Sequence, residues 1–394
     1  IDLQSRRKSL RWNEETVYAL GLYKFIGRSL GIWPLRCNDI ESRIRLLVIA
    51  ALFSTCSIMI EIMSGCISIF DAVDFIGLLG TNTVCMLKIW VVRLNEKKVR
   101  RILESAVNDW SMVCDDESLD VMRKFAYRGK FVSIFQLSVA YLAAGFIIAG
   151  ALPTLGRTTE RGTDVENFTV EEWRNLPMGT GCSVVDAPIF FYLGLYVLQF
   201  IQLLCVCTCN FGTDSLFFGI AMHLCAQYEL LRNDIAGLHR HDGEKKSKRR
   251  FVTLIQRHNH LVRLVNFVED VFHPIILGQL VASSLHITLL DHYYTTLLYT
   301  PTAIILLLLQ LCMYSFVGDC LSSQAKEMRN AAYNCSWYNF SPSFAKDVMF
   351  VIMRSNNSFH LTAGKVIRMN IEGFTRIVKT MALFFSVIKI TIIG

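Results

Sequence analysis

The chain has 394 residues, 53% of them hydrophobic, and a formal net charge of +7. A mean hydropathy of +0.38 excludes a disordered protein and favours a membrane protein. Motifs of common enzyme and cofactor sites, such as a phosphate-binding glycine loop or a metalloprotease helix, do not occur in the sequence. We therefore expect neither an enzyme nor a bound cofactor or metal.

Apolar segments long enough to cross a bilayer, which takes about 20 helical residues, recur along the chain. The first is interrupted only by Glu61, and the second has a polar centre at residues 80–83. The next four contain no Asp, Glu, Lys or Arg. These six predicted spans cover residues 46–70, 72–92, 131–156, 187–213, 271–290 and 296–318.

A seventh span is predicted at residues 370–392, although it is amphipathic. Four charged residues interrupt it: Glu372, Arg376, Lys379 and Lys389. Charged side chains in a membrane helix face water or protein rather than lipid. A helix that lines a water-filled pore and a helix that packs its polar stripe on other spans both satisfy this requirement.

Basic residues gather in every second connection between the spans. Of 40 Lys and Arg, nine precede residue 46, nine lie in 93–130, nine in 214–269 and six in 319–370. The connections of opposite parity hold only Arg157, Arg161 and Arg174. Because basic loops stay on the cytoplasmic side, we predict a cytoplasmic N-terminus. Seven spans then place the C-terminus outside the cell.

The connections on the basic side are predicted to be helical. Apolar residues recur there at steps of three and four, as on one face of a helix. The fold is thus expected to be an all-α membrane protein whose helices extend into the cytoplasm. The extensions, residues 214–270 and 319–369, would form a cytoplasmic anchor, with a solvated loop at 239–250.

The chain contains glycosylation sequons and a cluster of cysteines. Asn167 begins a glycosylation sequon in the one long outer connection, so it is predicted to carry sugar. The sequons at Asn334 and Asn356 fall on the inner side and should be silent. Cys205, Cys207 and Cys209 alternate on one helix, where packing is a better explanation than a metal site. A disulfide such as Cys66 with Cys182 is left open.

The C-terminal third resembles the signature of insect odorant receptors. The residues that carry the resemblance lie at 358–365, 369–374, 378–380 and 385–389. Weaker matches occur in the family's order at 31–34, 214–227, 314–323 and 331–338. Together they run from about Trp33 to Gly394, which is nearly the whole chain. The seven-span, inverted topology of that family is the one that the charge pattern predicts.

The resemblance implies an odorant-gated, non-selective cation channel in the plasma membrane of olfactory sensory neurons. Such subunits form a tetramer with an obligate co-receptor and contact membrane lipid, with neither nucleic acid nor G protein as a partner. The odorant binds between spans two to six in the outer half, and the seventh helix of each subunit lines one pore. The uncharged spans favour a small, neutral, hydrophobic or volatile ligand.

Site residues follow from these positions in the sequence. The ligand-binding candidates lie in the outer halves of the spans: Phe75, Leu78, Leu79, Tyr141, Gly145, Ile148, Phe190, Phe191, Gly194, Leu195, Ser283, Ser284, Thr302 and Leu306. The pore candidates share one stripe of the seventh span: Thr380, Phe384, Val387 and Thr391. The subunit-anchor candidates are Tyr333, Trp337, His360 and Lys365.

One departure from the family pattern bears on the role of this subunit. Leu383 and Phe384 stand where many family members have a Ser-Tyr pair, so the predicted pore lining is more apolar. This favours a tuning subunit over the co-receptor, and so does the short connection at 239–250. A gustatory receptor-type channel is the nearest alternative. A G-protein-coupled receptor is disfavoured because its N-terminus would lie outside.

Overall fold

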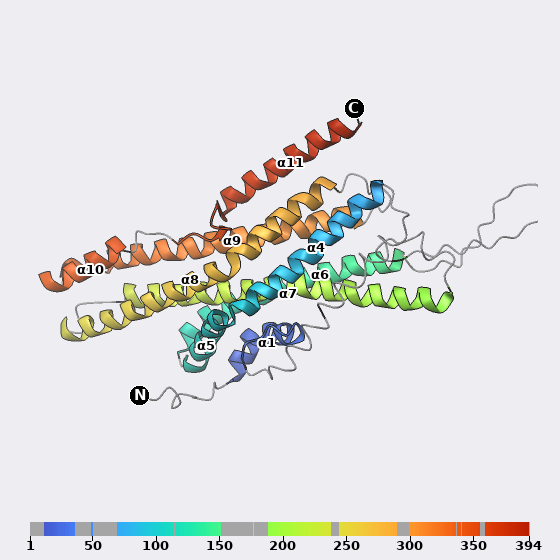
Figure 1. Ribbon diagram of the computed structural model, residues 1–394. Helices are drawn as coiled ribbons and strands as arrows, with labels where there is room; N and C mark the ends of the chain where they lie inside the picture. The colour runs from blue at the N-terminus through green and yellow to red at the C-terminus, as the bar shows by residue number, and fades with distance from the viewer. Residues whose placement is uncertain are drawn as a thin grey trace, which may run out of the picture.

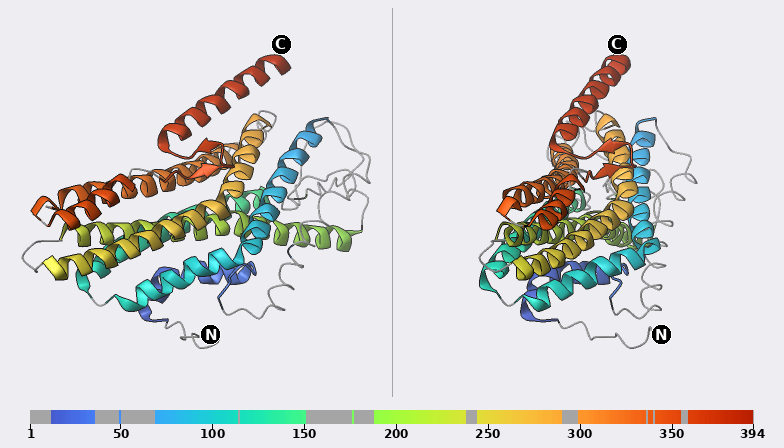
Figure 2. Two further views of the ribbon diagram at one scale, coloured as in Figure 1. Left: turned by 60° about the vertical axis from the view of Figure 1, so that its left-hand side comes forward. Right: turned by 90° about the vertical axis from the view of Figure 1, so that its left-hand side faces the viewer.

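The computed structural model describes residues 12–35, 49, 69–113, 115–150, 176, 188–237, 244–289, 299–335, 337–339, 341–354 and 359–393. Nearly all of these residues are helical, which confirms the all-α prediction. Four long helices pack along one another (Figures 1 and 2). They are α6 (Asp116–Gly150), α7 (Ile189–Ala236), α8 (Glu244–Leu289) and α9 (Tyr299–Asn334).

The length of these helices exceeds what a membrane needs. α7 has 48 residues and α8 has 46, so each measures about 70 Å at about 1.5 Å per residue. The hydrocarbon core of a bilayer is about 30 Å thick. Each helix can therefore cross a membrane and continue into water, which leaves room for the predicted cytoplasmic extensions.

Within the described part of the chain, four helical stretches are long and apolar enough to cross a membrane. They are Asp116–Gly150, Ile189–Ala236, Lys246–Leu285 and Ile304–Asn334. These stretches contain most of the four uncharged predicted spans. The predicted spans 72–92 and 370–392 lie in α4 (Ile69–Leu94) and α11 (Ile371–Ile393). Most of the predicted span 46–70 and Asn167 lie outside the described residues.

The predicted loop at 239–250 is wrong in its second half. α7 ends at Ala236, and α8 already begins at Glu244. The residues from Glu244 to Arg250 are mostly Lys and Arg, which favour a helix. Glu244 lies at the start, where a negative charge interacts well with the helix dipole. A charged sequence thus formed a solvated helix rather than a solvated loop.

Two shorter helices flank the long ones, α1 (Glu14–Ser29) and α5 (Glu96–Met112) (Figure 1). Asn13 caps α1 by accepting a hydrogen bond from the Thr16 amide at 2.8 Å, and its own amide donates to the Trp110 carbonyl of α5 at 3.2 Å. α5 buries apolar residues at steps of three and four: Val99, Ile102, Leu103, Ala106, Val107 and Trp110.

α1 docks on α7 through two glycines. A side chain at Gly219 would overlap the Tyr23 ring, and one at Gly212 would overlap Ile26. Tyr23 and Ile26 are only 3% and 5% exposed. The absence of side chains on α7 thus allows α1 to approach closely enough to bury both residues.

The C-terminal segment turns back on the long helices before α11 begins. After α9 come the short 3-10 helix η3 (Trp337–Asn339) and α10 (Pro342–Arg354). Two short strands, β1 (Thr362–Ala363) and β2 (Ile367–Arg368), then pair antiparallel. Gly364 and Lys365 form the turn between them, each with φ of 62°. From this hairpin α11 projects away from the other helices (Figures 1 and 2).

The main core lies where the middle parts of α7, α8 and α9 meet. The Phe217 ring centroid lies 4.8 Å from that of Phe272 and 5.5 Å from that of Tyr314. All three side chains are at most 1% exposed. Aromatic packing of this kind holds the three helices in one register.

Candidate functional site

A charged pair is buried between α4 and α7. The Lys88 ammonium nitrogen lies 2.8 Å from Asp214 Oδ2, and the two side chains are 0% and 1% exposed. Lys88 also donates to the Asn210 carbonyl at 3.2 Å and to the Asn210 side-chain oxygen. Isolated charges are costly in such surroundings, and ionisable groups within membrane helices usually mark functional sites.

α9 completes this polar network. Gln310 donates from its amide nitrogen to Asp214 and, at 3.2 Å, to Asn210 Oδ1. The Tyr314 hydroxyl donates to Asp214 Oδ1. Asp214 therefore accepts hydrogen bonds from three side chains on two other helices, which offsets much of the cost of burying its charge. Lys88, Asn210, Asp214, Gln310 and Tyr314 are called the intramembrane network below.

The spacing of the residues explains why the network forms. Asn210 and Asp214 are four residues apart on α7, and Gln310 and Tyr314 are four apart on α9. Residues at this spacing lie one above the other on one helix face. The pair on α7 contacts Lys88 directly, and the pair on α9 donates to the α7 pair. The network thus ties α4, α7 and α9 together at one depth.

Polar side chains continue from the network toward the predicted outer ends of the helices. The Cys85 thiol of α4 approaches the Val206 carbonyl of α7 at 3.7 Å. Asn82 and Gln202 each lie about one turn earlier on these two helices, so they are at a similar level. On α8, Gln279 donates to the Ser283 hydroxyl at 3.1 Å. Asn82, Gln202, Gln279 and Ser283 are all at least 93% buried.

Among the oxygens of this polar column, Asn82 Oδ1 and Gln279 Oε1 have no hydrogen-bond partner among the described residues. Leu87 of α4 lies where a side chain on Gly278 of α8 would project. Gln279 directly follows this glycine, and Asn82 lies five residues before Leu87. A buried acceptor without a donor costs about 1–3 kcal/mol. A water molecule or a ligand hydroxyl removes this cost.

The predicted ligand residues on α6 and α7 divide between an interface and the surface. The Tyr141 hydroxyl and Thr208 share a hydrogen bond of 2.7 Å, and Tyr196 donates to the Ile148 carbonyl at 3.1 Å. Leu195 is 9% exposed, whereas Phe190 and Phe191 are 84% and 54% exposed. Gly145 and Gly194 have nothing within 4 Å of the position of a side chain.

The remaining ligand candidates come from α8, α9 and α4. Ser283 is buried, and Ser284 donates to the Leu280 carbonyl at 2.8 Å. Leu306 packs with Ala140, Ala143 and Phe211, and Thr302 is half-buried one turn away. The side chains of Phe75, Leu78 and Leu79 lie outside the described residues, although these positions are helical in α4.

The pore candidates lie on a helix that exposes most of its length in the protomer. Phe384 and Val387 are 60% and 58% exposed. The Thr380 hydroxyl donates to the Arg376 carbonyl at 2.9 Å. The side chain of Thr391 lies outside the described residues. α11 thus presents an apolar face that the other described helices leave exposed.

The anchor candidates separate into two groups. Trp337 packs against the core, whereas Tyr333 is 63% exposed. His360 and Lys365 lie in the hairpin segment that leads into α11. Burial, and then the nearby Arg368 and Lys326, lower the pKa of His360. The Lys365 nitrogen lies 4.0 Å from Asp270 Oδ1 of α8.

The sequence reasoning missed how firmly this hairpin is attached to α8 and α9. The Gly364 amide donates to the His273 carbonyl at 2.9 Å, and the Thr362 amide donates to Glu269 Oε2 at 3.1 Å. The Ile371 amide, at the start of α11, donates to Asp319 Oδ2 of α9 at 2.8 Å. The segment that leads into α11 is thus bonded to both α8 and α9.

The sequence profile described as "7tm Odorant receptor" matches residues 68–382, well over half of the chain. The chain belongs to the odorant receptor family. The resemblance seen in the C-terminal third is thereby confirmed, as is the expectation of a receptor rather than an enzyme. The matched region includes the intramembrane network and most of α11.

Comparison with individual relatives bears on which kind of odorant receptor subunit this chain is. It is 22% identical over 326 residues to Odorant receptor 13a of Drosophila melanogaster, which covers 76% of this chain and 75% of that protein. The match to the Odorant receptor coreceptor of Anopheles gambiae is 26% identical over 141 residues, 34% of this chain and 30% of that protein. The broader match to a receptor other than the co-receptor agrees with a tuning subunit.

Solved structures share the fold of this odorant receptor. The insect olfactory receptor OR5 from Machilis hrabei in complex with eugenol superposes with a TM-score of 0.73 at 15% identity, over 95% of this chain and all of that one. A second structure of the same receptor gives a TM-score of 0.71 at 16% identity. The fold is therefore that of an insect olfactory receptor over nearly its full length.

Proposed function

We propose that this chain is the odorant-binding subunit of a ligand-gated, non-selective cation channel in the plasma membrane of olfactory sensory neurons. Membership of the odorant receptor family carries the proposal, because the match at 68–382 includes every long described helix. The same match favours an odorant receptor over the gustatory receptor-type alternative, which has the same expected topology.

The proposed topology has seven spans, with the N-terminus in the cytoplasm and the C-terminus outside. The asymmetry of Lys and Arg between alternate connections supports this orientation. The four long apolar stretches support the central spans. The inner parts of α7, α8 and α9, with the segment 319–369, would then form the cytoplasmic anchor of the subunit.

The proposed ligand site lies in the outer half of the bundle, above the intramembrane network. The hydrogen bond between Tyr141 and Thr208 supports a site beside α6 and α7. The unpaired oxygens of Asn82 and Gln279 add a polar side to it. A small, neutral, mostly apolar ligand with one hydroxyl donor satisfies both features.

The proposed gating step couples this site to α11 through the long helices. The network joins α4, α7 and α9, and α9 holds the first turn of α11 through Asp319. In a tetramer with co-receptor subunits, the exposed stripe of Thr380, Phe384 and Val387 would line the central pore. A ring of apolar side chains closes a pore by excluding water, so opening requires these helices to separate.

Co-expression with an insect odorant co-receptor tests this function. We expect cation currents when a panel of neutral volatiles is applied, and none from cells that express this chain without a co-receptor. Within the panel, an alcohol or phenol should be at least about tenfold more potent than its O-methyl ether, because the ether cannot donate to a buried acceptor. Currents that require a G protein, or no response above co-receptor alone across a broad panel, would contradict the proposal.

A further inference from the structure

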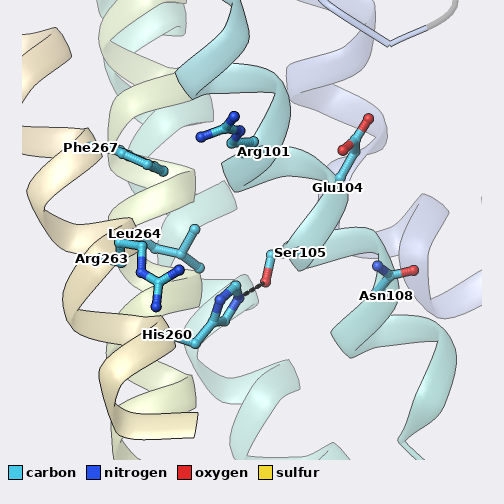
Figure 3. A pocket seen from close by; sticks show the side chains of 8 residues that line it. All are labelled: Arg101, Glu104, Ser105, Asn108, His260, Arg263, Leu264 and Phe267. Atoms are coloured by element: carbon cyan, nitrogen blue, oxygen red, sulfur yellow. Dashed lines mark hydrogen bonds between the residues drawn. The ribbon is translucent and has the colours of Figure 1, made fainter. Parts of the chain in front are cut away.

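A basic cleft lies between α5 and α8, apart from the predicted ligand, pore and anchor residues. Its volume is about 370 Å³. Arg101 and Ser105 of α5 line one wall, and His260, Arg263 and Phe267 of α8 line the other (Figure 3). The side chains of Arg101, Arg263 and His260 extend into the space between the two helices (Figure 3).

The two arginines of the cleft lack a carboxylate partner among the described residues. Other cations nearby are paired: Lys98 with Asp270 at 2.9 Å, and Arg100 with Glu96 at 3.2 Å. Glu104, the one acidic residue of the lining, points away from Arg263 and His260 (Figure 3). Positive charge is therefore left uncompensated at this one place between α5 and α8.

The walls hold the cationic groups in place. The Arg101 guanidinium lies over the Phe267 ring, 5.9 Å from its centroid. The Ser105 hydroxyl and His260 Nε2 are 2.9 Å apart and share a hydrogen bond. Beneath them Leu264 is 3% exposed and gives the cleft an apolar floor. The guanidinium groups thus approach a common space from opposite helices.

We propose that this cleft binds a phosphate-bearing ligand. A carboxylate is satisfied by one bidentate arginine, whereas a phosphate monoester carries close to two negative charges and three acceptor oxygens. Two guanidinium groups with the Ser105 hydroxyl match that larger demand. The cleft volume accommodates a phosphorylated ring or a nucleotide-sized headgroup.

The depth of the cleft narrows the sources of the phosphate, if the proposed orientation holds. Arg263 precedes the predicted span at residue 271 by eight residues, which is about 12 Å along a helix. The headgroup layer on each side of a bilayer is about 5–8 Å thick. The phosphates of ordinary phospholipids lie closer to the bilayer centre than the cleft does. The extra phosphates of a phosphoinositide project further into the cytoplasm, toward the cleft. A soluble organic phosphate can also reach it.

Binding to the purified full-length chain in lipid nanodiscs tests the proposal. The probes are a fluorescent short-chain phosphatidylinositol bisphosphate, soluble inositol trisphosphate and phosphatidylserine. The test variant is Arg101→Gln with Arg263→Gln, and the matched control is Arg100→Gln with Arg257→Gln, which removes the same charge from the same two helices outside the cleft. Size-exclusion profiles show whether each variant stays folded.

We expect the phosphoinositide to bind the wild type and the control pair alike, and the test pair at least about tenfold more weakly. Similar loss for inositol trisphosphate would assign a soluble source, and loss for the lipid alone would assign the headgroup; both support the site. Equal binding of the test and control pairs, equal binding of phosphatidylserine, or no binding of either phosphate probe would overturn it. None of these outcomes depends on odorant responses, so the proposed channel function is tested separately.

Discussion

The two ends of α7 carry similar apolar side chains but expose them differently. In the proposed orientation its N-terminal part is the outer part and its C-terminal part is the inner part. Phe190, Leu193 and Val197 in the outer part are 84%, 46% and 53% exposed, whereas Phe217, Leu224 and Leu231 in the inner part are fully buried. Lipid tails cover an apolar side chain as well as protein does. In water the same side chain must be covered by other residues. The change between the two parts agrees with a membrane boundary near the predicted end of this span at 213.

Two kinds of contact join α7 to its neighbours. Apolar and aromatic packing surrounds Phe217, whereas the intramembrane network of Lys88 and Asp214 joins the helices by polar bonds about one turn nearer the outer part. Packing is spread over many atoms, but a polar network depends on each member. Single substitutions should therefore have their largest effects at the network and smaller, more local effects elsewhere.

The largest effect is expected from breaking the buried charge pair. Asp214→Leu leaves the Lys88 ammonium buried without its carboxylate, which costs about 3–5 kcal/mol. We expect a large fall in the thermal unfolding midpoint of the full-length receptor, measured by fluorescence-detected size exclusion, and loss of surface expression.

The matched control removes both charges. Lys88→Met with Asp214→Leu leaves no buried ion, so its unfolding midpoint should return close to that of the wild type. Odorant currents need not return with it, because α4, α7 and α9 would no longer be joined by directional bonds. A double variant as unstable as the single one would show that packing volume, rather than charge, holds this level of the bundle.

The next largest effect is a difference in stability between alanine variants of two glycines of α7, one in each region. Gly219→Ala forces a methyl group against the buried Tyr23 ring, and such overpacking costs about 1–3 kcal/mol. Gly194→Ala meets nothing within 4 Å, so better helix propensity should stabilise it by up to about 1 kcal/mol. Thermal unfolding of both variants measures the contrast. Equal midpoints would mean that α1 does not dock on α7 as described.

Much of the helical framework could be predicted from the sequence, because its signals are local. Runs without charge located α6 to α9, and steps of three and four residues predicted helices beyond the spans. Pairing between helices is not local: Lys88 and Asp214 are 126 residues apart. Lys88 lies in the predicted span 72–92, where a charge requires a partner, and Asp214 follows directly after the predicted fourth span.

The candidate site was only partly predictable, because an apolar side chain suits lipid and a ligand pocket equally. Phe190 and Phe191 stay predicted ligand residues, and their side chains are 84% and 54% exposed in the protomer. Helix rotation decides between these environments, and one sequence does not determine it. Amide side chains within the spans are a clearer sign of burial. Asn82, Gln202 and Gln279 are all buried in the structure, although the sequence alone did not show that they lie near one another.

A smaller, functional effect is expected in the outer region at Gly145. Gly145→Trp would fill open space near Tyr141, so we expect about a tenfold change in the half-maximal concentration of the larger odorants. Dose–response curves with the co-receptor measure it. Leu142→Trp is the control, since Leu142 is 57% exposed on the same helix. If both variants respond like wild type, α6 does not border the ligand site.

The smallest effect is expected at α11, where this chain contributes only part of a shared pore. Val387→Ser adds a hydroxyl to the predicted apolar constriction and makes it easier for water to enter. We expect a higher basal current in cells that also express the co-receptor, with odorant potency nearly unchanged, because α11 lies far from the proposed ligand site.

Leu383→Ser separates the pore from a general effect of polarity on α11. Leu383 and Val387 are 68% and 58% exposed, but they differ by about 40° around the helix at about 100° per residue. Leu383 lies outside the predicted pore stripe of Thr380, Phe384 and Val387, so its variant should raise the basal current less than Val387→Ser does. A higher leak from Leu383→Ser than from Val387→Ser would move the pore-facing stripe to Leu383. An unchanged basal current in both variants would indicate that the co-receptor subunits alone form the gate.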